Sequence, residues 1–198
     1  NRNSNKFRSA IALLGSENSL RGQKNVFKTS ADSVVLIDNW IGNNPEDAVY
    51  NGSGAGIIRK IPDRSQGEKY TFIVTNWHVI DGADLVRVCF KPPGNSRGEI
   101  DCNDGAKAIV LGYSIEKDLA LIGIETKKIL KVIPYADHEK IQTGDTAHAI
   151  GHPEGYYWTY SKGDISGIRN NHKWTIEGYK HNASIIQTSA SINPGNSG

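Results

Sequence analysis

The sequence contains no methionine, only two cysteines and only seven prolines among its 198 residues. It also lacks any apolar run near the roughly 20 residues that a transmembrane helix needs, so no membrane-spanning segment is predicted. The net charge is +2 at pH 7 and forms no basic stripe, which argues against a nucleic-acid surface. Because the sequence begins at Asn1 without a methionine, we expect a processed or cut chain whose targeting signal has been removed.

The few cysteines and histidines limit metal and redox chemistry. Cys89 and Cys102 flank a segment rich in glycine, proline and asparagine, so they either bridge across a long hairpin, as suits an oxidising compartment, or remain two inert thiols. The pair offers too few ligands for zinc. His148 and His152 are spaced for one face of a helix, but neighbouring glycine and proline residues disfavour a helix there, and we therefore predict no metal site.

Short segments of β-branched and aromatic residues, bounded by turn residues, recur through the first 125 positions. Strands are predicted over 33–37, 53–59, 70–75, 85–90, 106–113 and 119–125. A short helix is predicted over 23–32, and no long amphipathic helix is present. This pattern indicates an all-β fold whose first part is a closed barrel.

The charged segment 126–143 contains Pro134 and lacks strand alternation, which predicts a linker between two bodies. Further strands are predicted over 146–150, 159–168 and 183–190, with 174–179 as an arm of a hairpin. These make about half of a second barrel. The expected organisation is an N-terminal extension (1–22), a first β-barrel (23–125), the linker (126–143) and a second β-barrel that stops after Ser197 (144–198).

Three polar residues stand at strand ends, where a rigid scaffold can present them to one cleft: His78, Asp118 and Ser197. Alone, each has an ordinary explanation as a turn residue or a structural histidine. Together they have the composition of a catalytic triad, because a serine hydroxyl needs a base to take its proton and an acid to orient that base. Their order, His then Asp then Ser, is the chymotrypsin order and differs from that of α/β-hydrolases and subtilisins.

The serine lies in the run Asn193-Pro-Gly-Asn-Ser-Gly198, whose composition alone would indicate only a loop. Gly195 can adopt backbone angles that other residues avoid. The backbone amides of Gly195 and Ser197 are therefore candidates for an oxyanion hole.

Four segments resemble the trypsin-like serine proteases of the HtrA (Deg) type, and the resemblance runs from about Val26 to the end. They are Thr75-Asn-Trp-His-Val79, Asp118-Leu-Ala-Leu-Ile122, Ala149-Ile-Gly-His-Pro153 and Gln187-Thr-Ser-Ala-Ser-Ile-Asn-Pro-Gly-Asn-Ser-Gly198. The resemblance implies two perpendicular six-stranded antiparallel barrels with the active site between them. It also implies hydrolysis of peptide bonds through an acyl-enzyme, without metal or cofactor, by His78, Asp118 and Ser197.

The resemblance further implies unfolded or exposed polypeptides as substrates, a homotrimer, downstream PDZ modules and an extracytoplasmic location in bacteria. It places an activation-sensitive loop around 154–159. The sequence departs from the family at Ser189, where aspartate is common, at the bulky Trp77 before the histidine, and in the longer hairpin over 91–104.

The family continues beyond the position of Gly198 with strands that close the second barrel and line the specificity pocket. An open half-barrel leaves backbone groups unpaired, so we expect an incomplete product: either a cleaved or truncated form, or part of a longer protein. A complementary C-terminal segment of the same protein could then complete it. Two alternatives stay open. One is a catalytically inactive, trypsin-like peptide-binding module; the other is a viral or extracellular chymotrypsin-like protease, which the run 192–198 makes less favoured.

Overall fold

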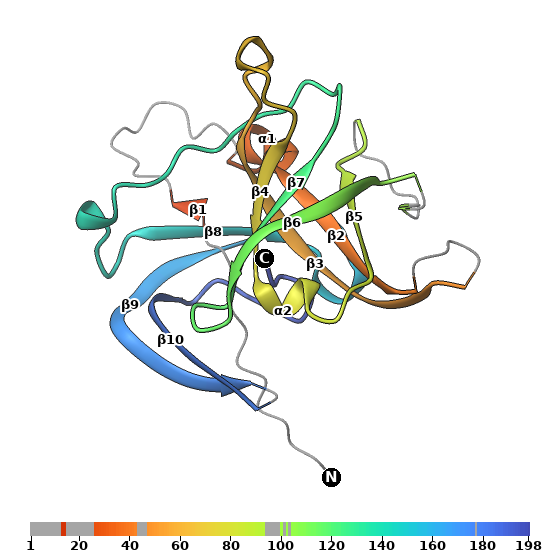
Figure 1. Cartoon of the computed structure of the whole chain (residues 1–198). Helices are drawn as coiled ribbons and strands as arrows, with labels where there is room; N and C mark the ends of the chain where they lie inside the picture. Colours follow the sequence, from red (N-terminus) through yellow and green to blue (C-terminus); the bar gives the residue numbers. More distant parts are fainter. Residues whose placement is uncertain are drawn as a thin grey trace.

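The structure, a computed structural model, describes residues 13–14, 26–42, 47–93, 100, 102, 104–176 and 178–198. Apart from positions 13 and 14, the expected extension 1–22 lies outside the described residues. Figure 1 shows a barrel in the upper half of the view and a strongly curved sheet below it, with the C-terminus beside α2 where the two bodies meet.

Six antiparallel strands form a closed barrel in the order β2-β3-β4-β7-β6-β5. They are β2 (Val34–Ile41), β3 (Val49–Lys60), β4 (Thr71–Thr75), β5 (Leu85–Phe90), β6 (Ala106–Ser114) and β7 (Leu119–Ile124). Alternate aliphatic residues of these strands fill the barrel, among them Ile37, Ile58, Ile73 and Ile122, each fully buried. The predicted all-β fold with a closed first barrel is confirmed.

The second body is a four-stranded antiparallel sheet in the order β1-β8-β9-β10. Its strands are β1 (Leu13–Leu14), β8 (Thr146–Gly151), β9 (Thr159–Ile176) and β10 (Tyr179–Thr188). β9 joins the predicted strand 159–168 to most of the predicted arm 174–179, because pairing with β10 makes a strand of the polar residues 169–173, which have no strand signal of their own. We call the outer part of this hairpin, residues 169–176 and 178–182, the hairpin arm.

The helical segments are short. They are α1 (Val26–Ser30), α2 (Trp77–Ile80), and the 3-10 turns η1 (Ala31–Ser33), η2 (Arg64–Gln66), η3 (His138–Lys140) and η4 (Pro153–Gly155). The helix predicted over 23–32 corresponds to α1 and η1, whereas α2 was not predicted. Within the described part of the chain, no helix has the length and apolar character to cross a membrane.

The two bodies meet through a second apolar cluster outside the barrel core. Side chains of β2 alternate between the two cores: Val35 lies in the barrel and Val34 in the cluster. Trp158 joins the bodies directly, because its ring is buried in the cluster and its Nε1 donates a hydrogen bond to the Val34 carbonyl at 2.9 Å. The cluster members are Ala31, Val34, Leu36, Ala55, Ile57, Cys89, Cys102, Ile150 and Trp158.

Cys89 and Cys102 form a disulfide with a Cα–Cα separation of 5.7 Å. The two sequence alternatives, a bridge or two free thiols, are thus resolved in favour of the bridge. Both cysteines are buried in the cluster between the bodies, so the disulfide lies at the surface of the first barrel that receives Trp158.

Candidate active site

His78 is the second residue of α2, the single helical turn that follows β4. Its ring Nδ1 lies 2.8 Å from Oδ2 of Asp118, and its backbone N–H donates to Oδ1 of the same carboxylate at 3.0 Å. An ionised carboxylate only accepts hydrogen bonds, so Nδ1 carries the proton and Nε2 is left as the acceptor. The two contacts fix both the position of the helix start and the tautomer of the ring.

Asp118 is fully buried and stands at the head of β7 with a φ of 52°. Its backbone N–H donates to the carbonyl of Ile115 at 3.1 Å, closing the turn that precedes it. Its carbonyl accepts a hydrogen bond from Nδ2 of Asn76 at 2.6 Å. A non-glycine residue adopts positive φ only where its surroundings hold it there, and these bonds are part of that constraint.

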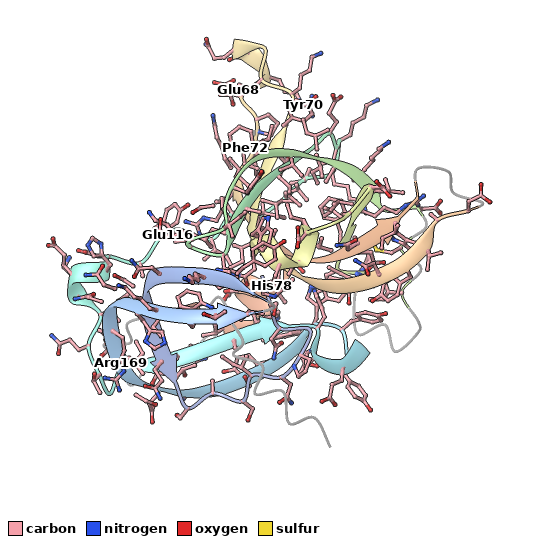
Figure 2. All side chains as sticks on the ribbon, turned by 60° about the horizontal axis from the view of Figure 1, so that its bottom comes forward. Glu68, Tyr70, Phe72, His78, Glu116 and Arg169 are labelled. Atoms are coloured by element: carbon pink, nitrogen blue, oxygen red, sulfur yellow. A yellow bond between two sulfur atoms is a disulfide. The ribbon has the colours of Figure 1, made fainter. Side chains whose placement is uncertain are left out.

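The chain around Ser197 is docked on the first barrel by two hydrogen bonds, one to the backbone of β3 and one to the side chain of Asn76. The Ser197 carbonyl accepts from the N–H of Ala55 on β3, and the N–H of Gly198 donates to Oδ1 of Asn76 at 2.7 Å. Asn76 therefore links the segment that carries the serine to the residue that orients the histidine ring, Asp118. Figure 2 shows His78 at this junction of the two bodies.

The segment before the serine is fixed by the second body. Gly195 has a φ of 93°, and a Cβ at this position would lie 2.2 Å from the carbonyl oxygen of His152, so only glycine fits. The N–H of Glu154 donates to the Pro194 carbonyl at 2.9 Å. Because a trans peptide points its C=O and N–H in opposite directions, the Gly195 amide faces away from the 152–154 segment.

The side chain of His152, whose backbone contacts this segment, is buried and neutral. It is 1% exposed, its Nδ1 accepts a hydrogen bond from the Trp158 N–H at 3.0 Å, and burial lowers its pKa to about 4. Its Nε2 is buried and makes no hydrogen bond of acceptable geometry, although the Val35 backbone beside it opposes part of the pKa shift. His152 thus contacts the Gly195 segment through its backbone, while its buried ring carries no charge at neutral pH.

The other sequence candidates have structural partners. His148 Nδ1 lies 2.8 Å from the Tyr160 hydroxyl, and within the described ranges no group of three or more His, Cys, Asp or Glu residues is placed to hold a metal ion. Ser189 exchanges hydrogen bonds with Asp164: its hydroxyl accepts from the Asp164 N–H at 2.9 Å and its N–H donates to the Asp164 carbonyl at 3.0 Å.

Sequence reasoning missed Asn76 and the contacts of the hairpin arm with the first barrel, although it predicted residues 174–179 as an arm of a hairpin. Asn76 could have been found from its position between β4 and His78, since a polar residue at a strand-to-helix junction often bonds to nearby backbone groups. The contacts of the hairpin arm with the first barrel carried no local signal, because they join residues more than 60 positions apart.

The chain is similar to one family model and to several curated proteins. A family model described as a trypsin-like peptidase domain matches residues 54–198. The serine protease Do-like HtrA of Bacillus subtilis is 33% identical over 152 residues, which cover 75% of this chain and 30% of the relative. The protein of the same name from Lactococcus lactis is 34% identical over 182 residues, which cover 89% of this chain and 40% of the relative.

The periplasmic serine endoprotease DegP of Salmonella typhimurium is 33% identical over 159 residues, which cover 79% of this chain and 29% of the relative. The chain therefore spans less than half the length of these curated relatives.

Proposed function

Because the chain belongs to the trypsin-like peptidase family, as a member of the HtrA type, we propose that it is a serine endopeptidase that cleaves unfolded or exposed polypeptides. In this proposal Ser197 is the nucleophile, His78 the general base and Asp118 the residue that orients the base. Neither a metal nor a cofactor takes part.

One observation carries the proposal: the carboxylate of Asp118 contacts both the ring Nδ1 and the backbone N–H of His78, at 2.8 and 3.0 Å. This arrangement leaves Nε2 of the ring as a proton acceptor, as general-base catalysis requires. The hydrogen bonds through Asn76 support the same assignment, since they connect this pair to the segment that contains Ser197.

The proposed reaction has two halves. Ser197 Oγ attacks the carbonyl carbon of the scissile peptide bond while its proton passes to Nε2 of His78, and Asp118 stabilises the imidazolium that forms. The tetrahedral intermediate collapses as His78 gives that proton to the leaving amine, which yields the acyl-enzyme and a new amino terminus. A water molecule then attacks the ester, again with His78 as base, and releases the acid product and the free serine.

The negative oxygen of each tetrahedral intermediate would be bound by the backbone amides of Gly195 and Ser197. The positive φ of Gly195 and the anchoring of the preceding carbonyl by Glu154 support this role, because they turn the Gly195 amide away from the 152–154 segment. Preorganised donors of this kind act on the charge that develops in the transition state.

We extend the proposal to the setting of the protein. An extracytoplasmic location is supported by relatives named as periplasmic proteases and by the disulfide, which suits an oxidising compartment. The resemblance to HtrA-type proteases alone supports a homotrimer, a PDZ module and a complementary C-terminal segment.

Labelling with a fluorophosphonate probe tests the nucleophile. We expect the parent full-length protein to be labelled and to degrade an unfolded polypeptide, and Ser197→Ala to do neither. Ser184→Ala is the matched control, because Ser184 is an exposed serine on β10, and it should behave like the parent.

The same experiment separates the protease from the inactive peptide-binding module. Folded parent protein that retains an unfolded polypeptide but is neither labelled nor able to cleave it would favour the binding module. Equal labelling of the parent and Ser197→Ala would show that the probe reacts elsewhere and would overturn the assignment of the nucleophile.

A further inference from the structure

The hairpin arm of the second body contacts the turn that presents Asp118. Nδ1 of His181 lies 2.6 Å from the carbonyl oxygen of Ile115. A carbonyl cannot donate, so His181 Nδ1 carries the proton of this bond. The next residue, Asn182, donates its N–H to the carbonyl of Glu116 at 2.7 Å. Figure 2 shows Glu116 beside the ribbon of this hairpin.

These two bonds act on the turn whose last residue is Asp118. The Ile115 carbonyl accepts from the Asp118 N–H at 3.1 Å as well as from His181, which uses both of its lone pairs. The positive φ of Asp118 depends on surroundings that hold the turn. The arm supplies part of those surroundings from outside the first barrel.

The same arm also contacts the helix that carries His78. The ring of Tyr179 packs edge-to-face against that of Trp77, with centroids 4.7 Å apart. Trp77 is buried and is the first residue of α2, directly before His78. Three residues of the arm, Tyr179, His181 and Asn182, therefore contact the segments that precede the two members of the His78–Asp118 pair.

His181 is itself held in place by its own hairpin. It is 4% exposed, and Trp174, its register partner on β9, stacks against its ring with centroids 5.1 Å apart and an interplanar angle of 22°. His172 stacks in turn on Trp174 at 5.9 Å. This row of rings orients the His181 Nδ1–H toward Ile115 rather than leaving the ring to rotate.

We propose that the hairpin arm positions the His78–Asp118 pair, with His181 and Tyr179 as positioning residues. The inference rests on the proposed function, because it assigns these residues a role in the reaction of that site. In this proposal they contact neither the reacting atoms nor the substrate. They act by fixing the two segments that carry the pair, and small displacements of such groups reduce catalysis strongly.

The test compares two substitutions at His181 in the full-length protein. His181→Leu removes the donor to Ile115, whereas His181→Asn keeps an N–H donor near the position of Nδ1. We expect His181→Leu to lower kcat about tenfold with KM unchanged, and His181→Asn to retain most of the parent rate. Tyr179→Ala and Tyr179→Phe form a second pair, of which only Tyr179→Ala removes the ring against Trp77.

Lys180→Ala is the matched control, because Lys180 is an exposed residue of the same arm, and it should leave kcat unchanged. A second readout does not require activity: the low-field proton NMR signal of the His78 Nδ1–H, which reports its bond to Asp118. We expect this signal to weaken or move in His181→Leu and to persist in His181→Asn and Lys180→Ala.

The outcomes are distinguishable. An equal loss of kcat in His181→Leu and His181→Asn would overturn the positioning role. So would a loss of kcat that is explained by a smaller fraction of folded protein, if the low-field signal of the folded protein is unchanged. If the folded parent does not react with the fluorophosphonate probe, the proposed function fails, while the NMR comparison still decides whether the arm holds the pair.

Discussion

The closed barrel and the open sheet differ in how their strands obtain partners. Every strand of the barrel pairs on both sides, and its core is filled by its own side chains. In the described part of the sheet, β10 pairs only with β9, and few of its residues are buried. The buried Trp158 of the second body lies in the cluster against the barrel. We therefore expect the barrel to support itself and the sheet to depend on its contacts with the barrel.

The residues of the candidate site are divided between these two bodies. His78 and Asp118 belong to the self-supporting body, and the serine segment and hairpin arm to the dependent one. The two bodies also hold buried ionisable groups with opposite responses to pH. In the sheet, burial lowers the pKa of His152 to about 4; in the barrel, burial raises the pKa of Asp38 to about 6, partly opposed by Arg87.

The largest effect is expected where the bodies join. Trp158→Ala should lower the free energy of unfolding by about 3–5 kcal/mol, because it leaves a cavity in the cluster and removes the hydrogen bond to Val34. Hydrogen exchange measured by residue should accelerate in β8–β10 far more than in β2–β7. Tyr156→Ala is the control, since Tyr156 is 71% exposed. Equal acceleration in both bodies would show that the barrel depends on the sheet as much as the reverse.

Acid should weaken the sheet through His152. Its pKa is about 4 in the folded protein, below the ordinary 6.5, so the unfolded chain binds the extra proton first. The stabilisation is complete above pH 6.5 and is lost as the pH falls toward 4, by at most about 3 kcal/mol. Denaturation of the parent and His152→Leu between pH 4 and 7 measures it. The free energy of unfolding of His152→Leu should no longer fall with pH in this range. His138→Gln, which alters an exposed histidine, should keep the pH dependence of the parent.

The barrel should show the opposite trend through Asp38. Its pKa of about 6 exceeds the ordinary 3.8, so the folded state binds the proton more tightly than the unfolded chain. The stabilisation is complete below pH 3.8 and is lost as the pH rises through 6, by somewhat less than 3 kcal/mol. Asp38→Asn should therefore stabilise the protein at pH 7. Asp47→Asn, at an exposed position, should not, and an unchanged melting profile for Asp38→Asn would contradict the prediction.

The smallest effect is expected from cutting the linker, which we propose to be residues 126–143. Its Ile129 is completely exposed and Tyr135 is 79% exposed, so limited trypsin digestion should cleave near Lys127 and Lys131. The two fragments should stay associated through the cluster and elute together in size-exclusion chromatography. Fragments of Trp158→Ala should separate; separation of the parent fragments would mean that the linker itself holds the bodies together.

The barrel was predictable because its strands alternate in short blocks between turn residues, as in Leu85–Phe90, where the predicted and observed bounds agree. The all-β fold and the family also followed from the sequence. The sequence also predicted an arm over 174–179, but not that residues 169–173 would join it to the strand over 159–168, because these polar residues form a strand only by pairing with β10. The disulfide stayed undecided because spacing alone cannot fix the distance between two cysteines.

For the candidate site, the sequence singled out His78 and Asp118, and the structure places them in hydrogen-bonding contact. Their proposed roles, and those of Ser197 and Gly195, remain predictions. The residues that support them were hidden from sequence reasoning. In the sequence, His181 is an isolated polar residue, and only folding brings it into contact with Ile115.

Asn76 gives the junction between the two bodies a cooperative character. One amide side chain donates to the Asp118 carbonyl through Nδ2 and accepts from the Gly198 N–H through Oδ1. Ordering of the carboxyl-terminal residues and ordering of the Asp118 turn are therefore thermodynamically linked, and the linkage is reciprocal. Whatever tightens one of these two segments favours the other by the same free energy, so the site should assemble as a unit.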